Sequence, residues 1–249
     1  MRFAAVLFDL GYTLLDYGPP GRWSDFRTQR MEQLHPLAVE LWGEIELSAQ
    51  EFGQRVGSAL QTDEMRALEH GGLSLPFAER MRAALAGIGL APGQEQLGRF
   101  MEAFHQPIRD WPRPYPDTEQ SLAELRSLGL SLAIITNAPW DAPGPMLSAD
   151  LERWGLRGFF AAFIGSGEVP WRKPNPEFMW AAAKALAVPP PRCLVVGDNP
   201  SADIAGARAA GMCCVWMNRD GQVFPPEAPR PDWVAQSLRQ VVEVVRSAG

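Results

Sequence analysis

Residues 3–9 of the chain read FAAVLFD, six apolar residues followed by an aspartate. A short, continuous apolar run without alternation is typical of a strand that is buried on both faces, as in a parallel sheet. The run ends at Asp9, and Gly11 follows two residues later. Because functional groups of open parallel sheets gather at the carboxyl ends of the strands, Asp9 is a candidate site residue.

The part of the chain after Pro116 alternates similar apolar runs with helical patterns. We expect helices at 117–128, 147–154, 176–186, 201–210 and 232–247, and strands at 130–135, 161–164, 193–196 and 213–217. Strands that alternate with helices indicate βαβ units with right-handed crossovers, and therefore a parallel sheet.

Between these two parts the sequence has helical patterning and no long apolar run. Ser48 and Glu51 have the spacing of a capping box, ahead of a helix that extends to about Leu60. Two more helices are expected, one led by Pro76 and one at 92–106. We therefore predict an α/β fold: a Rossmann-like parallel-sheet core from residues 1–16 and 109–249, with an inserted all-helical cap from residues 17–108.

Composition narrows the classes of function. The net charge is −6 and no basic run is present, which disfavours nucleic-acid binding. The first apolar run is too short to span a membrane and is unlike a signal peptide, and the three cysteines have no metal-site spacing. We expect a cytoplasmic protein; a small phosphorylated ligand stays compatible with the acidic charge, because a metal ion and one lysine can reverse the local field.

The predicted strand ends and the loops after them carry a set of groups suited to phosphoryl transfer. Asp9 could attack phosphorus, and Asp9 with Asp198 could bind Mg²⁺, which prefers oxygen ligands. Lys173 could neutralise negative charge, and Thr136 could donate a hydrogen bond to a phosphate oxygen.

Four segments in order carry a resemblance to a known family: FDLGYTL (8–14), IITN (134–137), RKPNP (172–176) and GDNPSAD (197–203). They resemble the four motifs of the haloacid-dehalogenase-like hydrolases, and in particular of the phosphatase-like members with a helical cap. The segments YPDTEQSLAELRSLG (115–129) and VWMNRDG (215–221) are also similar to stretches of such members.

The resemblance implies a role for each matching residue. Asp9 would be the nucleophile, Thr136 and Asn137 would bind the transferring group, and Lys173 would neutralise its charge. The implied metal site consists of Asp9, the backbone carbonyl of Gly11, Asp198 and Asp203, the last as a ligand or as an additional acidic group beside the ion.

The sequence departs from the family pattern at Gly11, where most phosphatases of this family have an aspartate that serves as general acid and base. Glycine keeps the backbone carbonyl but removes the proton donor, and such acid–base catalysis typically contributes about 10²- to 10⁴-fold. The residues considered as substitutes are Tyr12, Asp16, His35, His70 and His105. Trp140 and Trp171 adjoin the motifs and are candidates to line the cleft, although packing is the commoner role of tryptophan.

The leading hypothesis is a Mg²⁺-dependent phosphohydrolase that acts on a small phosphorylated metabolite through an aspartyl-phosphate, slow or specialised because of Gly11. One alternative is a 2-haloacid dehalogenase, whose halide leaving group needs no proton; the acidic segment at 197–203 argues against it. The other alternative is a member without catalysis that binds a phosphorylated ligand or a protein partner.

Overall fold

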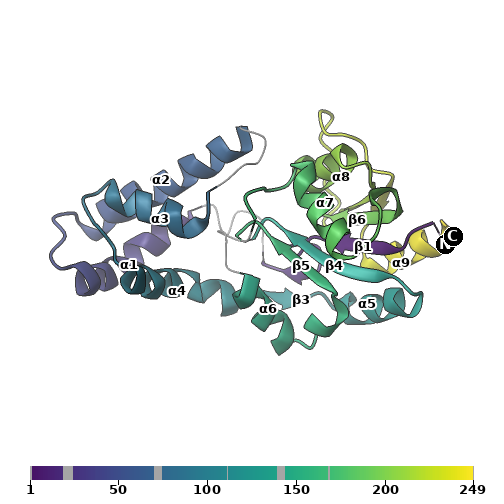
Figure 1. Cartoon of the computed structure of the whole chain (residues 1–249), viewed down its shortest axis with the longest axis horizontal. Coiled ribbons are helices and arrows are strands. Elements are labelled where there is room, and N and C mark those ends of the chain that lie inside the picture. Colours follow the sequence, from purple (N-terminus) through teal and green to yellow (C-terminus); the bar gives the residue numbers. More distant parts are fainter. Residues whose placement is uncertain are drawn as a thin grey trace. The chain divides into compact units, whose positions relative to one another are not determined.

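The computed structural model describes residues 2–18, 25–69, 75–110, 112–138, 144–167 and 169–248. The chain divides into two compact units, one formed by Met1–Tyr17 with Pro112–Gly249 and the other by Gly18–Trp111. The first is an α/β unit and the second is helical (Figure 1).

A parallel sheet forms the centre of the α/β unit. Among the described residues it has six strands in the order β5-β4-β1-β6-β7-β8. Their bounds are β1 Ala5–Phe8, β4 Ser131–Thr136, β5 Ala162–Gly165, β6 Cys193–Gly197, β7 Cys213–Met217 and β8 Trp233–Ala235. Strand β1 lies between β4 and β6, and Phe8 pairs with Ile134 on one side and Val196 on the other. The order of the strands changes direction at β1, which is where open α/β sheets bind their ligands.

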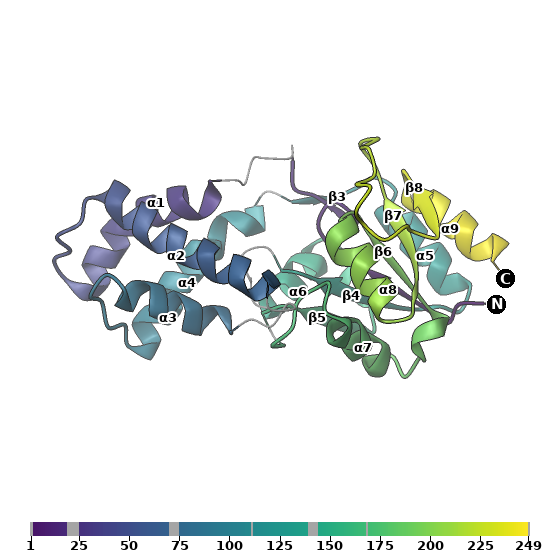
Figure 2. The same cartoon turned by 90° about the horizontal axis from the view of Figure 1, so that it is seen from above.

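Helices pack on both faces of this sheet, which explains why its strands are apolar throughout. Alternate residues such as Ala5 and Leu7 of β1 join the core cluster under α7 and α8. Helices α5 and α9 pack together against the other face (Figures 1 and 2). The helices of this unit are α5 Thr118–Ser127, α6 Gly144–Arg153, α7 Pro176–Ala185, α8 Ala205–Ala209 and α9 Leu238–Ser247, with short 3₁₀ turns at Arg157–Phe159 and Pro190–Arg192.

The helical unit contains α1 Phe26–Trp42, α2 Ala49–Glu69, α3 Phe77–Ala86 and α4 Gln94–Asp110. The predicted capping box at the start of α2 is confirmed: Glu51 accepts from the backbone N–H of Ser48, and the Ser48 hydroxyl accepts from the backbone N–H of Glu51. Helices α1 and α2 approach closely at Gly57, where a Cβ would lie 2.9 Å from the Cα of Thr28. The absence of a side chain at Gly57 permits this approach. None of the described helices combines the length and the apolar character needed to cross a membrane.

The structure corrects two expectations from the sequence and adds one element that the sequence did not indicate. The predicted helix 232–247 was wrong at its start, because residues 233–235 form the edge strand β8 and Ser237 caps a helix that begins at Leu238. The predicted helix 201–210 opens as a π-helical turn, Pro200–Ile204, before α8. A two-residue antiparallel ladder of β2 (Leu15–Asp16) with β3 (Arg113–Pro114) was missed altogether.

Candidate active site

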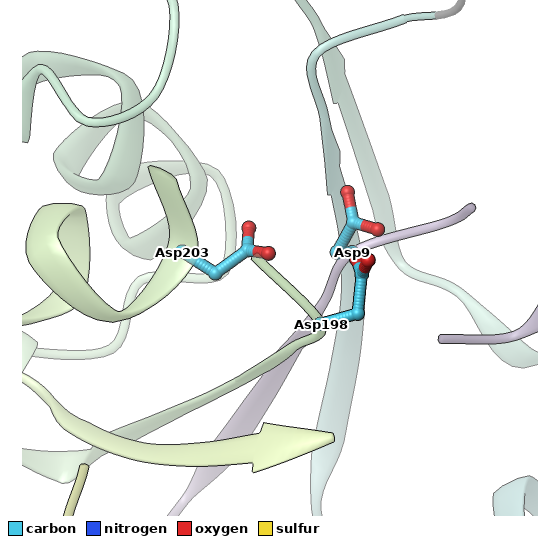
Figure 3. Close-up of side chains that lie close together, drawn as sticks. All are labelled: Asp9, Asp198 and Asp203. Atoms are coloured by element: carbon cyan, nitrogen blue, oxygen red, sulfur yellow. The ribbon is translucent and has the colours of Figure 1, made fainter. Parts of the chain in front are cut away.

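Three neighbouring segments bring three aspartates together at the carboxyl edge of the sheet. Asp9 follows β1, Asp198 follows β6, and Asp203 lies in the π-helical turn after β6. Carboxylate oxygens of the three lie within 4.8 Å of one another (Figure 3). Three carboxylates at this separation repel one another strongly unless cations lie between them.

Lys173 is the cation that the protein itself places in this cluster. Its Nζ donates to Asp9 Oδ1 at 2.5 Å, to Asp203 Oδ1 at 2.6 Å and to the backbone carbonyl of Ile135 at 3.1 Å. The ammonium is 2% exposed, and all three of its N–H groups have protein acceptors. Among the described residues one ammonium faces three carboxylates, so the cluster would carry an excess of negative charge with all three ionised.

Asp203 is fixed from both ends of its carboxylate. Its Oδ1 accepts from Lys173, and its Oδ2 accepts from the backbone N–H of Asn199 at 3.0 Å. The absence of a side chain at Gly197 permits this position, since a Cβ there would lie 2.2 Å from Asp203 Cγ. Glycine is therefore required at position 197 because the Asp203 carboxylate lies against it, and not because of a turn in the backbone.

Burial and mutual repulsion change the proton affinity of these groups. Burial raises the pKa of Asp9 to about 6, with Lys173 lowering it and Asp203 raising it. Burial, Asp9 and Asp203 also raise the pKa of Asp198 well above its usual range, against the opposing effect of Lys173. Burial alone would lower the pKa of Lys173, but Asp203 and Asp9 raise it above its ordinary value. Without a further cation, ionisation of Asp9 and of Asp198 is therefore disfavoured.

These features fit a divalent metal ion. The donors are hard carboxylate oxygens from different segments of one sheet edge, the type of ligand that Mg²⁺ takes. Burial first, and then neighbouring carboxylates, raise the pKa of Asp9 and of Asp198, and a bound cation would oppose both effects by favouring the ionised forms.

A tight loop follows the aspartate at the end of β1. The carbonyl of Leu10 accepts from the backbone N–H groups of Leu14 and Leu15, and Tyr12 takes a left-handed conformation with φ of 53°. The side chain nearest to the space over Gly11 is that of Tyr17, whose Cε2 would lie 3.4 Å from a Cβ at this position. Burial, Asp9 and Asp150 raise the pKa of the Tyr17 phenol above its ordinary value.

The side chain of Asn137, predicted to bind the transferring group, makes two hydrogen bonds with the backbone of Lys173. Its amide N–H donates to the carbonyl of Lys173 at 3.1 Å, and its carbonyl oxygen accepts from the backbone N–H of Lys173 at 2.9 Å. This reciprocal pair fixes the backbone that carries the Lys173 side chain. Thr136 is buried at the end of β4, where its carbonyl accepts from the backbone N–H of Ser166.

The structure describes the surroundings of four of the five proposed substitutes for a general acid. His105 packs between Phe77 and Phe104 within the helical unit, and His35 stacks edge-on against Phe52. Trp171 packs against the apolar core of the α/β unit. His70 and Trp140 lie outside the described residues. Asp16 is exposed on β2, and the Tyr12 ring contacts the Tyr17 ring at 6.0 Å between centroids.

Sequence reasoning missed two residues that contact the site loops. Trp216 donates from Nε1 to the carbonyl of Asp198 at 2.8 Å, and Arg219 donates to the carbonyl of Thr13 at 2.9 Å. Both belong to the segment VWMNRDG, whose similarity to the family was the one available signal. Tyr17 had no signal, because its place beside Gly11 arises from the turn between them.

Comparisons with known proteins agree with this architecture. The model of the haloacid dehalogenase-like hydrolase family matches residues 3–211. A phosphoserine phosphatase of Thermus thermophilus is 40% identical over 167 residues, which cover 67% of this chain and 64% of the relative. A phosphoglycolate phosphatase of Neisseria meningitidis is 34% identical over 149 residues, which cover 58% of this chain and 61% of the relative. The chain thus spans somewhat less than two thirds of each of these relatives.

Solved structures extend the likeness of fold over nearly the whole chain. A 2-haloacid dehalogenase from Pseudomonas syringae covers 99% of this chain and 100% of its own, with a TM-score of 0.71 and 24% identity. A HAD phosphatase from Thermococcus onnurineus covers 98% of both chains, with a TM-score of 0.65 and 23% identity. With the family model matching most of its length, this chain belongs to the haloacid dehalogenase-like hydrolases.

Proposed function

We propose that this protein is a Mg²⁺-dependent phosphohydrolase that acts on a small phosphorylated metabolite through an aspartyl-phosphate on Asp9. The observation that carries the proposal is the buried Asp9 carboxylate, bound by Lys173 at 2.5 Å and lying among Asp198 and Asp203 at the carboxyl edge of the sheet. The relatives named as phosphatases of phosphoserine and phosphoglycolate support a small phosphate ester as substrate.

In the first step, a carboxylate oxygen of Asp9 attacks the phosphorus of the substrate. The new O–P bond forms as the P–O bond to the leaving group breaks, and the leaving alkoxide takes a proton from solvent, which the attacking water returns to solvent in the second step. In the second step a water molecule attacks the same phosphorus, the bond to Asp9 breaks, and inorganic phosphate is released with the carboxylate restored. Lys173 balances the charge of Asp9 and of the incoming phosphate.

Asp9, Asp198 and the carbonyl of Gly11 would bind the metal ion, with Asp203 placed beside them by Lys173 and Asn199. Bound Mg²⁺ supplies positive charge that draws the phosphate toward the carboxylate and stabilises charge developing on its oxygens. Without it, the cluster would repel a phosphate group, because its own negative charge exceeds that of the single ammonium.

We assign substrate selection to the helical unit, residues 18–111, as the cap of the enzyme. Caps of this kind can exclude water and contact the part of the substrate away from the phosphate. Exchanging exposed residues of this unit should alter KM among substrates more than kcat, as measured on a panel of phosphate esters.

The main test is phosphate release from a broad panel of phosphorylated metabolites, with Mg²⁺ and with a chelator. The wild type should hydrolyse at least one small ester in a metal-dependent manner, and Asp9→Asn should abolish both turnover and the acid-stable phosphoryl-enzyme. Metal-dependent hydrolysis that survives in Asp9→Asn would contradict the proposed nucleophile. Release of halide from a 2-chloro acid in the presence of chelator would favour the dehalogenase alternative.

Gly11→Asp separates a handicapped enzyme from a binding protein. A Cβ at Gly11 meets the Tyr17 ring at 3.4 Å, an ordinary contact, so the substitution is sterically accessible. If the site is catalytic, the added carboxyl should raise the rate by up to about 10²-fold, the lower end of acid–base catalysis. Absence of hydrolysis in both forms across the panel would favour the binding alternative.

A further inference from the structure

We infer that Arg219 is a positioning residue for the reaction proposed above: it fixes the loop that carries Asp9 and Gly11, although it lies beyond the last of the four motifs. Its Nη2 donates to the backbone carbonyl of Thr13 at 2.9 Å, across 206 positions of the sequence. The inference rests on the proposed function for its catalytic meaning and on the hydrogen bonds of the α/β unit for its geometry.

The position of Arg219 is fixed by several contacts. The same Nη2 lies 3.3 Å from Asp117 Oδ1, and the guanidinium stacks over the Tyr115 ring with Cζ 3.8 Å from the centroid. Asp117 in turn accepts through Oδ2 from the backbone N–H of Leu238, at the start of α9, at 2.7 Å. The side chains of Arg219 and Asp117 are each only 14% exposed, so the pair is well shielded from solvent.

The loop that Arg219 contacts is short of regular structure: Gly11 forms one β-bridge with Leu15, where the β2–β3 ladder begins. Within the loop, the Leu10 carbonyl accepts two backbone hydrogen bonds. The carbonyls of Thr13 and Leu14 accept hydrogen bonds from residues outside the loop. Leu14 accepts from the backbone N–H of Tyr115 and the hydroxyl of Thr118, so Arg219 supplies the contact one residue nearer to the site. A displacement at Thr13 is transmitted through two residues to Gly11, whose carbonyl is a proposed metal ligand.

The end of β7 and the loop after it together contact both sides of the site. Trp216 donates to the carbonyl of Asp198, and Arg219 three residues later donates to Thr13. This single segment therefore sets the spacing between the two loops that carry Asp9 and Asp198. Residues that orient the ligands of a metal ion typically change metal affinity or activity by about 10- to 100-fold when they are replaced.

The chain contains a matched control for a purely structural arginine–aspartate pair. Arg208 lies 3.0 Å from Asp232 Oδ1 and donates to the backbone carbonyl of Arg230, while Asp232 Oδ2 accepts from the backbone N–H of Cys214. Like Arg219, Arg208 donates to a backbone carbonyl and pairs with an aspartate that also accepts from a backbone N–H. The backbone group bound by this aspartate, that of Cys214, lies at the start of β7, away from the carboxyl edge. The Arg208 pair is somewhat more exposed, at 38% and 24%.

The experiment compares Arg219→Met, Arg219→Lys and Arg208→Met. Each purified variant is titrated with Mg²⁺ by calorimetry, assayed for kcat and KM on the best substrate of the panel, and unfolded in urea. Arg219→Met should weaken Mg²⁺ binding and lower kcat by about 10- to 100-fold with little change in KM. Arg208→Met should lose stability but keep the Mg²⁺ affinity and the kcat of the wild type. Arg219→Lys should recover much of the loss, because one nitrogen makes both bonds of Arg219.

Equal Mg²⁺ affinity and kcat in Arg219→Met and Arg208→Met, at comparable stability, would overturn the inference. Should Arg219→Met not fold, Asp117→Asn removes the counter-charge while keeping an acceptor, and its Mg²⁺ affinity decides the matter in the same way. The calorimetric readout is independent of turnover. A wild type that binds Mg²⁺ but hydrolyses nothing would therefore refute the proposed function and still test the position of Arg219.

Discussion

Replacing Asp9 by asparagine should stabilise the metal-free protein at neutral pH while it abolishes activity. The buried carboxylate costs folding free energy when it is ionised, and asparagine removes that charge yet keeps an oxygen to accept from Lys173. The charge of this nucleophile lowers the free energy of unfolding until metal binds. Its removal should therefore raise stability and abolish activity.

The magnitude follows from the pKa of Asp9, which is about 6 in the folded protein against 3.8 for a free aspartate. Since the folded pKa is raised, the favourable contribution is fully present below pH 3.8 and is lost as pH rises through about 6. The linkage relation makes the cost about 1 kcal/mol at pH 4.5 and about 3 kcal/mol at pH 8.

The assay is urea unfolding in chelator at pH 4.5 and at pH 8, for the wild type, Asp9→Asn and Asp16→Asn. Asp9→Asn should be more stable than the wild type at pH 8, and the gain should be smaller at pH 4.5. Asp16→Asn, which removes a charge from the exposed strand β2, should show no such dependence. Saturating Mg²⁺ should stabilise the wild type much more than Asp9→Asn. A loss of stability in Asp9→Asn at pH 8 without metal would refute the reasoning.

Three further predictions concern neighbouring positions. Gly197→Ala should lower kcat by about 10- to 100-fold in steady-state kinetics. The new Cβ would lie 2.2 Å from Asp203 Cγ and would therefore displace that carboxylate. Lys173→Met should destabilise the metal-free fold by about 3–5 kcal/mol at pH 8 in urea unfolding, since it leaves buried carboxylates without their cation; an unchanged midpoint would contradict it. Gly98→Ala, on the exposed side of α4 with open space around it, should raise the unfolding free energy by about 1 kcal/mol and leave kinetics unchanged, which makes it the control for Gly197.

The central part of the fold could be predicted from the sequence because buried parallel strands leave continuous apolar runs. Strands β1, β4, β6 and β7 are of this kind, and the predicted ranges overlap them closely. Strand β8 escaped detection because it is a three-residue edge strand, and its central residue Val234 is 55% exposed. The β2–β3 ladder has two residues a side and includes Pro114, so no periodicity could reveal it.

The candidate site shows a similar division between local and distant information. Asp9, Asp198 and Lys173 follow predicted strands or lie in motif loops, and their clustering follows from the parallel sheet. The contacts of Asn137 with the Lys173 backbone depend on how two loops fold over one another, and no local pattern encodes them. Arg219 contacts Thr13 across most of the chain, a pairing that depends on the strand order, which places β7 beside β6 and β6 beside β1.

The short ladder between β2 and β3 also bears on how such a protein can change over time. Leu15 lies opposite Pro114 and Asp16 opposite Arg113, so the chain leaves the α/β unit and re-enters it at adjacent points. Topologically, everything between is the loop of a hairpin, and lengthening a loop costs little free energy. Selection, or an engineer, could therefore exchange the whole helical segment for another between residues 17 and 112, while the strands that carry the aspartates keep their register.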